Sequence, residues 1–428
     1  MRFWPFCLSL LLSTVAFSQS MEYARSVVDT LTRPELFGRG YVQNGHNQVA
    51  QYLQAEFEAA GLQPVKQTYV QGFQLPVNLL AGNLEVVFGS DTLKPGVDYL
   101  IDGDAPSTNG TFQLIRVSRD QALDPNELAQ LVYFNKNAFL VIDESEYDLS
   151  REREGLFIQD FPKIMKFLDD LNIGGAIFLT EGKLTWSPTA FQGLHPVLRV
   201  QKDRFPLDAT EFHLKVDAVF RERQKSQNVL AMVEGAKEPD SFLVFTAHYD
   251  HLGTMGRDVY FPGANDNASG IAMLLSLAHH FGKSENRPPY SLLFLAFSGE
   301  EVGLFGSRHY VQQDPIVPLS QMRFLLNFDI LGTGDDGIMV VNAREFAEAF
   351  TLLETINEEQ QLLPAIKTRG KMCKSDHCFF YENGVPSYYF YTLGGIDAYH
   401  DLNDRPETLP LTAFQEIFTL IVEFVNRY

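Results

Sequence analysis

The sequence contains little cysteine and tryptophan, with 3 Cys and 2 Trp among 428 residues. One cysteine, Cys7, lies near the N-terminus within an apolar run. The other two, Cys373 and Cys378, are too few for a scaffold built on disulfides. In an oxidising compartment this pair could form a local disulfide, and the alternative is two free, partly buried thiols. The sequence leaves both alternatives open.

Positive charge is also scarce, because 34 Lys and Arg residues face 54 Asp and Glu residues and give a formal net charge of −20. Such a field repels phosphate backbones and anionic lipid surfaces, so nucleic acid and charged membranes are disfavoured as partners. It attracts cations instead. The composition is otherwise that of a globular protein, with 45% hydrophobic and 13% aromatic residues.

Long apolar runs are absent from the sequence, and the apolar run near the N-terminus is short. It extends from Phe6 to Phe17, which is less than the roughly 20 residues that a membrane-spanning helix requires. Small residues at Ala16 and Ser18 are typical of a signal-peptidase site. We therefore expect a signal peptide at 1–18, export to the periplasm or the extracellular space, and no membrane span.

The length of 428 residues exceeds that of one typical domain. Changes in sequence texture divide the chain into three parts after the expected signal peptide. Residues 19–96 begin with helical spacing of apolar residues and are expected to form the N-terminal part of the domain that residues 223–428 complete. Residues 97–222 contain short apolar runs between polar and Pro-containing segments, which predicts an inserted β-rich lobe. Residues 223–428 alternate strands, loops and helices and are expected to carry the catalytic site.

Residues 223–428 show the pattern of an open α/β sheet. Compact apolar runs alternate with segments of helical spacing, which predicts a mixed, mostly parallel central sheet covered by helices on both faces. The predicted buried strands are 242–246, 291–297, 324–328 and 387–391.

Histidines and carboxylates follow the carboxyl ends of these strands or begin the helix between them. In open α/β sheets, ligands bind beyond the carboxyl ends of the strands, so residues distant in sequence are expected to converge there. Imidazole and carboxylate groups are the zinc ligands available where thiolates are absent. Two histidines with three carboxylates suit two metal ions that share one bridging ligand. The candidate ligands are His248, Asp266, Glu301, Asp329 and His400.

The motifs around these residues resemble the M28 family of zinc peptidases over residues 226–410, and they occur in the order of the family. They read His-Tyr-Asp-His-Leu-Gly at 248–253, Gly-Ala-Asn-Asp-Asn-Ala-Ser-Gly at 263–270, Ser-Gly-Glu-Glu-Val-Gly-Leu-Phe-Gly-Ser at 298–307, Ser-Asp-His at 375–377 and Tyr-His at 399–400. Gly38-Arg39-Gly40 resembles part of the family's leading segment. Residues 174–177 in the inserted lobe resemble a protease-associated domain.

The resemblance implies a role for each candidate ligand. One zinc ion would be held by His248 and Asp329, and a second by Glu301 and His400. Asp266 would bridge the two ions, which makes two Zn2+ per chain. Carboxylate-rich sites also accept other divalent ions, such as cobalt or manganese.

The resemblance also implies roles for residues beside the ligands. Glu300 occupies the position of the general base, and Asp250 that of a carboxylate that orients the imidazole of His248. His377 resembles a substrate-side or oxyanion-stabilising residue, with a structural role as the equal alternative. Asp404 is expected to cap a loop, and the alternative is that it orients His400 as Asp250 orients His248. The other histidines are expected to have no role in the site: His46, His195, His213, His251, His279, His280 and His309.

Two zinc ions about 3.5 to 4 Å apart acidify a shared water molecule and polarise the peptide carbonyl, and Glu300 can pass the proton to the leaving amine. The resemblance therefore implies a secreted metal-dependent exopeptidase that acts on peptides or proteins, with an aminopeptidase as the leading version. The alternatives are a carboxypeptidase, a glutaminyl cyclotransferase with one zinc ion, and a non-catalytic binding module. The sequence determines neither the preferred side chain nor the oligomeric state.

Overall fold

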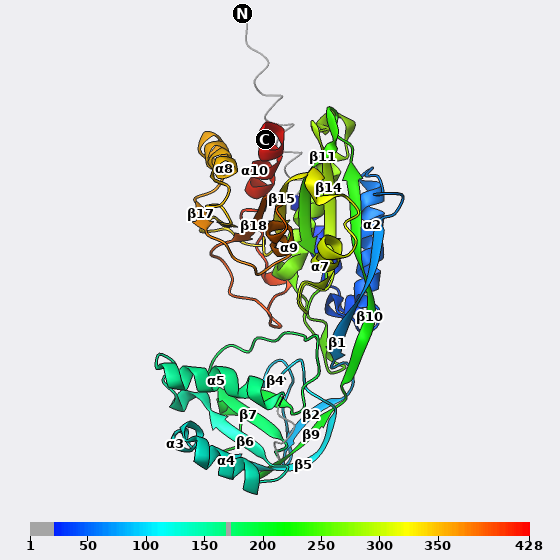
Figure 1. The fold of residues 1–428 in the computed structure, drawn as a ribbon. Helices are drawn as coiled ribbons and strands as arrows, with labels where there is room; N and C mark the ends of the chain where they lie inside the picture. Colours follow the sequence, from blue (N-terminus) through cyan, green and yellow to red (C-terminus); the bar gives the residue numbers. More distant parts are fainter. Residues whose placement is uncertain (1–20, 168–172) are drawn as a thin grey trace, which may run out of the picture.

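The structure, a computed structural model, describes residues 21–167 and 173–428. The expected signal peptide at 1–18 lies outside these residues. The described chain forms two lobes (Figure 1). The larger lobe contains the first helices and the C-terminal half of the chain, and the smaller lobe is formed by the segment between them. Each lobe is built around a sheet of eight strands within the described residues.

The sheet of the larger lobe is mixed and mostly parallel. In sheet order its strands are β1 Val70–Leu79, β10 Val219–Val233, β14 Tyr290–Phe297, β11 Glu238–His248, β15 Met322–Phe328, β18 Ser387–Thr392, β16 Ile338–Val341 and β17 Ile366–Arg369. The central strands β14, β11, β15 and β18 run parallel to one another. β10 pairs antiparallel with β1 and with β14, and β16 pairs antiparallel with β18. The predicted fold class is confirmed, and each predicted strand lies within one of the central strands.

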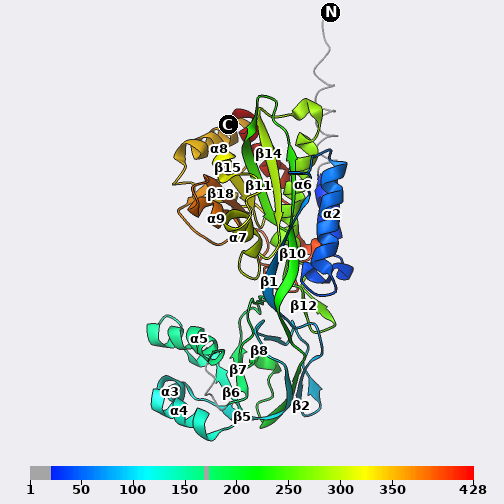
Figure 2. The same cartoon turned by 45° about the vertical axis from the view of Figure 1, so that its right-hand side comes forward.

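Helices cover both faces of this sheet (Figure 2). One face carries α2 Gly45–Ala59, α6 Ser269–Phe281, α8 Ala347–Gln360 and α10 Phe414–Arg427, and the other carries α7 Phe305–Gln312 and α9 His377–Glu382. In β11, Leu243 and Phe245 pack towards the first group, whereas Phe242 and Val244 pack towards the second. A strand buried on both faces needs apolar residues at every position, which explains its compact apolar run. Among the described residues, no helix combines the length and the apolar character that crossing a membrane would require.

The smaller lobe contains a second sheet with helices on one face. In sheet order its strands are β3 Asp91–Thr92, β2 Leu84–Phe88, β9 Glu211–Val216, β5 Thr108–Arg116, β6 Phe139–Asp143, β7 Gly175–Thr180, β8 Val197–Gln201 and β4 Tyr99–Ile101. The helices are α3 Arg119–Leu123, α4 Pro125–Phe134 and α5 Glu152–Met165. The lobe is therefore mixed α/β and not only β-rich. Its sheet begins at β2, before residue 97, and the division into domains stays a prediction.

The two lobes are joined by long strands and by a shared core. β1 and β10 pair along their length and run from the larger lobe towards the smaller one (Figure 2). The face of the smaller sheet that lacks α5 packs around Trp186, and the core there includes Leu252, Met255 and Phe261 from the segment after β11. That segment contains the short strands β12 Thr254–Met255 and β13 Val259–Tyr260. The smaller lobe thus packs directly on a loop that begins beside His248.

Candidate metal centre

Histidine and acidic side chains from separate segments meet at the carboxyl ends of the parallel strands. His248 is the last residue of β11, and Asp329 directly follows β15. Glu301 lies in the turn between β14 and α7. Asp266 lies in the short helical turn before α6, and His400 lies in the loop after β18. They converge because the carboxyl ends of parallel strands lie along one edge of the sheet.

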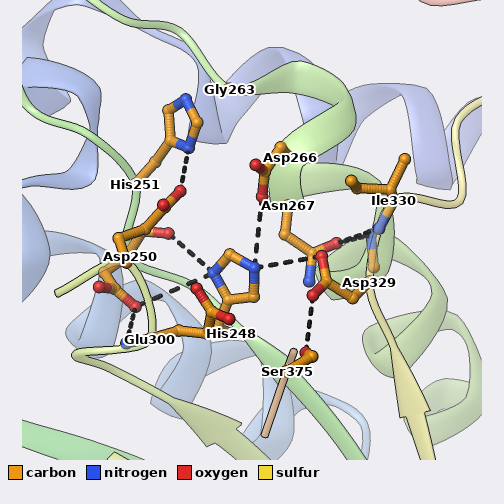
Figure 3. Close-up of polar contacts among 12 residues, drawn as sticks. His248, Asp250, His251, Gly263, Asp266, Asn267, Glu300, Asp329, Ile330 and Ser375 are labelled. Carbon is orange, nitrogen blue, oxygen red and sulfur yellow. Dashed lines mark hydrogen bonds and ion pairs between the residues drawn. The ribbon is translucent and has the colours of Figure 1, made fainter. Parts of the chain in front are cut away.

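The carboxylate of Asp266 lies between the two histidines. Its Oδ1 is 3.3 Å from Nε2 of His248, and its Oδ2 is 3.0 Å from Nε2 of His400. Each imidazole also faces a second carboxylate. Nε2 of His248 is 3.3 Å from Oδ1 of Asp329 (Figure 3), and Nε2 of His400 is 3.2 Å from Oε2 of Glu301. The site therefore has two halves that are joined by Asp266.

These side chains form a donor set that fits metal ions. Ligand atoms of His248, Asp266 and Glu301 lie within 4.8 Å of one another, and so do those of His248, Glu300 and Asp329. All of the predicted ligands are shielded from solvent, and the most exposed side chain, at 11%, belongs to His400. Carboxylates gathered in a buried site need compensating positive charge. Imidazole nitrogen and carboxylate oxygen together suit zinc, so the residues fit the predicted ions, although their roles stay predictions.

The pKa values of Glu301 and His400, which form one half of the site, reflect the attraction between these groups. Burial opposes a charge on His400, but the carboxylates of Glu301 and Asp266 outweigh it and raise the pKa of the imidazole to about 11. Burial also opposes a charge on Glu301, yet the imidazole of His400 outweighs it and lowers the pKa of the carboxyl to about 2. A proton on His400 therefore compensates the neighbouring carboxylates when no metal ion is bound. A bound cation would take over that compensation.

Glu300 lies beside the half of the site that contains His248 and Asp329. Burial raises the pKa of the Glu300 carboxyl well above its usual value, and the negative charges of Asp329 and Glu301 add to the increase, against the opposing effect of His248. A carboxyl group whose pKa is raised in this way is suited to take up a proton. The position of Glu300 is compatible with the predicted general base.

Asp250 contacts His248 in a different way from the one expected. The nearest acceptor to Nδ1 of His248 is the main-chain oxygen of Asp250, at 3.1 Å, whereas the carboxylate Oδ1 is 3.9 Å away. The carboxylate instead accepts a hydrogen bond from the hydroxyl of Tyr41, at 3.0 Å. It also accepts one from the main-chain N–H of Glu300, at 3.2 Å (Figure 3). The main chain of Asp250 therefore orients the imidazole, and its carboxylate connects the segment to the turn that carries Glu300.

His251 belongs to the site, which corrects the expectation that it has no role there. Its Nδ1 lies 2.7 Å from Oε1 of Glu301, and its side chain is fully buried. Glu301 therefore contacts His251 with one carboxylate oxygen and His400 with the other. The signal in the sequence was the repeated histidine in the segment 248–251. A histidine after a buried strand is more often part of the core, so its partner became visible only in the structure.

Ser375, from the Ser-Asp-His motif at 375–377, contacts a predicted zinc ligand. Its hydroxyl donates to Oδ2 of Asp329 at 2.7 Å and accepts a hydrogen bond from the side-chain amide of Asn327 at 2.8 Å. Cys373 and Cys378 form a disulfide that encloses this residue. Of the two alternatives for the cysteines, the structure therefore contains the local pair. The closed loop holds a hydrogen-bond donor against a predicted zinc ligand.

Two buried residues hold the main chain around Asp266. The carboxylate of Asp404 accepts hydrogen bonds from the N–H groups of Asn265, at 2.7 Å, and Asp266, at 3.0 Å, so the loop-capping prediction is confirmed. Arg39 is fully buried and donates to the carbonyl oxygens of Gly263, at 2.8 Å, and Asp266, at 3.1 Å. Its other acceptors are the carbonyl oxygens of Leu31, Tyr249 and Pro262. The resemblance had suggested no function for Arg39.

His377 begins α9 and is buried beside the site. Its Nε2 lies 2.8 Å from the carbonyl oxygen of Met372, and its ring packs against Tyr389. Burial lowers the pKa of the imidazole to about 4, which keeps it neutral near pH 7. This placement favours the structural alternative, and a substrate-side role for His377 stays a prediction.

The C-terminal half of the chain matches a known family, because residues 228–425 fit the sequence model of Peptidase family M28. Among its curated relatives, a "Probable zinc metalloprotease" of Pyricularia oryzae is 39% identical over 26% of this chain and 23% of its own length. "Aminopeptidase YwaD" of Bacillus subtilis is 32% identical over 38% of this chain and 35% of its own length. "Leupeptin-inactivating enzyme 1" of Streptomyces exfoliatus is 30% identical over 42% of this chain and 39% of its own length. The matches thus span less than half the length of these relatives.

Solved structures share the fold over nearly the whole chain. BSAP, a zinc aminopeptidase from Bacillus subtilis, has a TM-score of 0.71 at 19% identity and covers 95% of this chain and 94% of its own. A peptidase M28 precursor from Shewanella amazonensis has a TM-score of 0.72 at 17% identity and covers 96% of both chains. At this identity the likeness establishes the fold. Residues 228–425, whose motifs gather at one edge of this fold, therefore carry the sequence of peptidase family M28.

Proposed function

We propose that this protein is an exported exopeptidase that uses two zinc ions, and that it acts as an aminopeptidase. The observation that carries the proposal is the position of Asp266, whose two carboxylate oxygens lie 3.3 Å and 3.0 Å from the imidazoles of two different histidines. A carboxylate in that position is placed to bridge two metal ions. His248 and Asp329 would hold one ion, and Glu301 and His400 the other.

The residues of the site have distinct tasks in peptide hydrolysis. When bound, two zinc ions supply Lewis acidity for the carbonyl and lower the pKa of a water molecule towards neutrality. Glu300 is placed to accept a proton from water and to pass it to the leaving amine, a contribution of about 10²- to 10⁴-fold in rate. Neighbouring dications favour the ionised carboxylate, which is the form that a base requires. The main-chain oxygen of Asp250 keeps the proton of His248 on Nδ1 and leaves Nε2 free as a ligand.

The burial of Arg39 favours a substrate with a free amino terminus over one with a free carboxylate. A carboxypeptidase needs a cationic side chain that is free to bind the terminal carboxylate. Arg39 contacts the loop of Asp266, but it is fully buried and its donors are engaged by main-chain oxygens. It is therefore not available to a substrate. The similarity to "Aminopeptidase YwaD" supports the same choice.

Export and domain organisation are part of the proposal. The apolar leader at 1–18 supports a signal peptide, and the disulfide between Cys373 and Cys378 suits an oxidising compartment. We also propose that residues 97–222, which form most of the smaller lobe, are a protease-associated-like domain inserted between the two parts of the peptidase domain. The resemblance of residues 174–177 supports this assignment.

The test combines elemental analysis with a substrate panel. The purified protein is assayed on aminoacyl arylamides, on N-blocked peptides with free C-termini and on peptides that begin with glutamine, before and after treatment with a chelator. We expect release of N-terminal residues that is lost on chelation and restored by zinc, with two zinc ions per chain. Cleavage confined to N-blocked peptides would identify a carboxypeptidase, and pyroglutamate formation with one zinc ion would identify a cyclotransferase. If no substrate is cleaved, with or without zinc, the result would indicate a binding module.

A further inference from the structure

A segment of the smaller lobe reaches the predicted metal centre. It lies between β7 and β8, and it contacts the loop that carries His400. The main-chain N–H of Trp186 donates to the carbonyl oxygen of His400 at 2.9 Å. The hydroxyl oxygen of Ser187 lies 3.1 Å from Nδ1 of the same histidine. Nζ of Lys183 forms an ion pair with Oδ2 of Asp401 at 2.8 Å. The segment of the smaller lobe therefore contacts both His400 and the residue that follows it.

The two nitrogens of the His400 imidazole face different parts of the protein. Nε2 faces Oδ2 of Asp266 at 3.0 Å and Oε2 of Glu301 at 3.2 Å, which is the side of the predicted ion. Nδ1 faces Ser187. A neutral imidazole that binds a metal through Nε2 keeps its proton on Nδ1, and this N–H needs an acceptor that holds the ring in place. The hydroxyl oxygen of Ser187 is in the position of that acceptor.

The other predicted histidine ligand has its acceptor within the larger lobe. Nδ1 of His248 faces the main-chain oxygen of Asp250, two residues further along the same segment, at 3.1 Å. Ser187, in contrast, is 213 residues away from His400 in the sequence and belongs to the smaller lobe. The two halves of the centre are therefore supported differently, one by its own segment and the other from the smaller lobe.

The segment that carries Ser187 is anchored by its buried neighbour Trp186. The indole Nε1 of Trp186 donates to the carbonyl oxygen of Ile101 at 2.8 Å, and its ring stacks on Phe261 with 5.1 Å between the centroids. His400 itself has a φ of 53°, a left-handed conformation that a non-glycine residue adopts where its surroundings hold it. The bond from Trp186 to the carbonyl of His400 supplies such a restraint.

We propose that the smaller lobe completes the metal centre, with Ser187 as a positioning residue that accepts the Nδ1–H of His400 and keeps Nε2 directed at the metal ion. Docking of the smaller lobe and retention of the ion between Glu301 and His400 are then coupled. The inference rests on the proposed function, because it assigns a role towards an ion that this function requires.

The test compares the zinc affinity of full-length variants, measured by competition with a chromogenic chelator. Ser187→Ala is expected to weaken one of the two zinc ions by about 10- to 100-fold and to leave the other unchanged, because loss of a ligand's hydrogen-bond partner has effects of that size. Ser187→Thr keeps the hydroxyl and is expected to restore wild-type affinity. Thr185→Ala removes a hydroxyl from an exposed residue of the same segment and serves as the matched control.

A second readout separates positioning from a general effect on the fold. In a His400→Ala background, the remaining zinc ion should be held equally well with and without Ser187→Ala, and the thermal unfolding midpoint should not change. Equal affinity of Ser187→Ala and wild type for both ions would overturn the inference and leave the peptidase proposal intact. Weaker binding of both ions in Ser187→Ala and Thr185→Ala alike would also overturn it. A wild-type protein without affinity for zinc would overturn both proposals.

Discussion

Nδ1 of His251 lies 2.7 Å from Oε1 of Glu301, and both side chains are shielded from solvent. The contact leaves Oε2 of Glu301 directed at His400, at 3.2 Å. His251 therefore determines which oxygen of Glu301 faces the predicted ion. This relationship joins a histidine in the segment that follows β11 to the turn after β14.

Replacement of His251 is expected to weaken metal binding in the half of the site that contains Glu301. His251→Leu removes the hydrogen bond and should lower the affinity for one zinc ion by about 10- to 100-fold, as judged by chelator competition. His251→Asn places an N–H near the position of Nδ1 and should retain more of the affinity. Thermal unfolding of both variants controls for damage to the core. Equal affinities of the Leu and Asn variants would contradict the role of the hydrogen bond.

Replacement of Glu300 is expected to separate catalysis from metal binding. Glu300→Gln keeps the shape of the side chain but cannot accept the proton, so kcat should fall by about 10²- to 10⁴-fold while both zinc ions are retained. Steady-state kinetics measure the fall in kcat, and elemental analysis measures the zinc content. Glu358→Gln, at an exposed position of α8, is the matched control and should behave as the wild type. Turnover of Glu300→Gln close to that of the wild type would remove Glu300 from the mechanism.

Zinc binding is expected to release protons at pH 7, with affinity that falls as the pH decreases. In the absence of metal, Glu301 and Asp266 overcome the effect of burial and raise the pKa of His400 to about 11, so the imidazole carries a proton that zinc must displace. Calorimetry in two buffers with different ionisation enthalpies measures the number released. His400→Ala should release fewer protons and bind one ion less, whereas His309→Gln, outside the site, should match the wild type. A wild-type affinity independent of pH between 6 and 8 would contradict the assignment.

The smaller lobe is expected to lose stability at acidic pH through Glu154. Its Oε2 accepts from Nε of Arg119 at 2.9 Å and from the N–H of Asp148 at 2.8 Å. The hydrogen bond with Arg119 lowers the pKa of this carboxyl from 4.5 to about 2. Because the folded pKa is the lower one, the stabilisation is complete above pH 4.5 and disappears as the pH falls towards about 2.

Urea unfolding at a series of pH values measures this effect. Glu154→Gln should be less stable than the wild type near neutral pH, and the difference should vanish towards pH 2. Glu152→Gln changes an exposed carboxylate of the same helix and should leave the profile unchanged. A constant difference between Glu154→Gln and wild type at all pH values would show that the effect is not due to ionisation of Glu154.

The residues that gather in the site were predictable where they follow buried strands. His248 and Asp329 come directly after compact apolar runs, and the carboxyl ends of parallel strands share an edge, so local pattern and topology lead to the same place. The capping role of Asp404 was also predictable, because a short acidic side chain in a loop accepts main-chain N–H bonds. The contact of His251 with Glu301 was not, since a histidine after a buried strand carries no sign of its partner.

By itself, the sequence determined the strands of the central sheet and the set of candidate ligands, because both depend on apolar periodicity and on residues adjacent to it in the chain. Only the tertiary structure decided which groups hold those ligands in place. Ser187 meets His400 across 213 residues and between two lobes. The packing of distant segments around Trp186 brings these partners together, and no local pattern in the sequence predicts that packing.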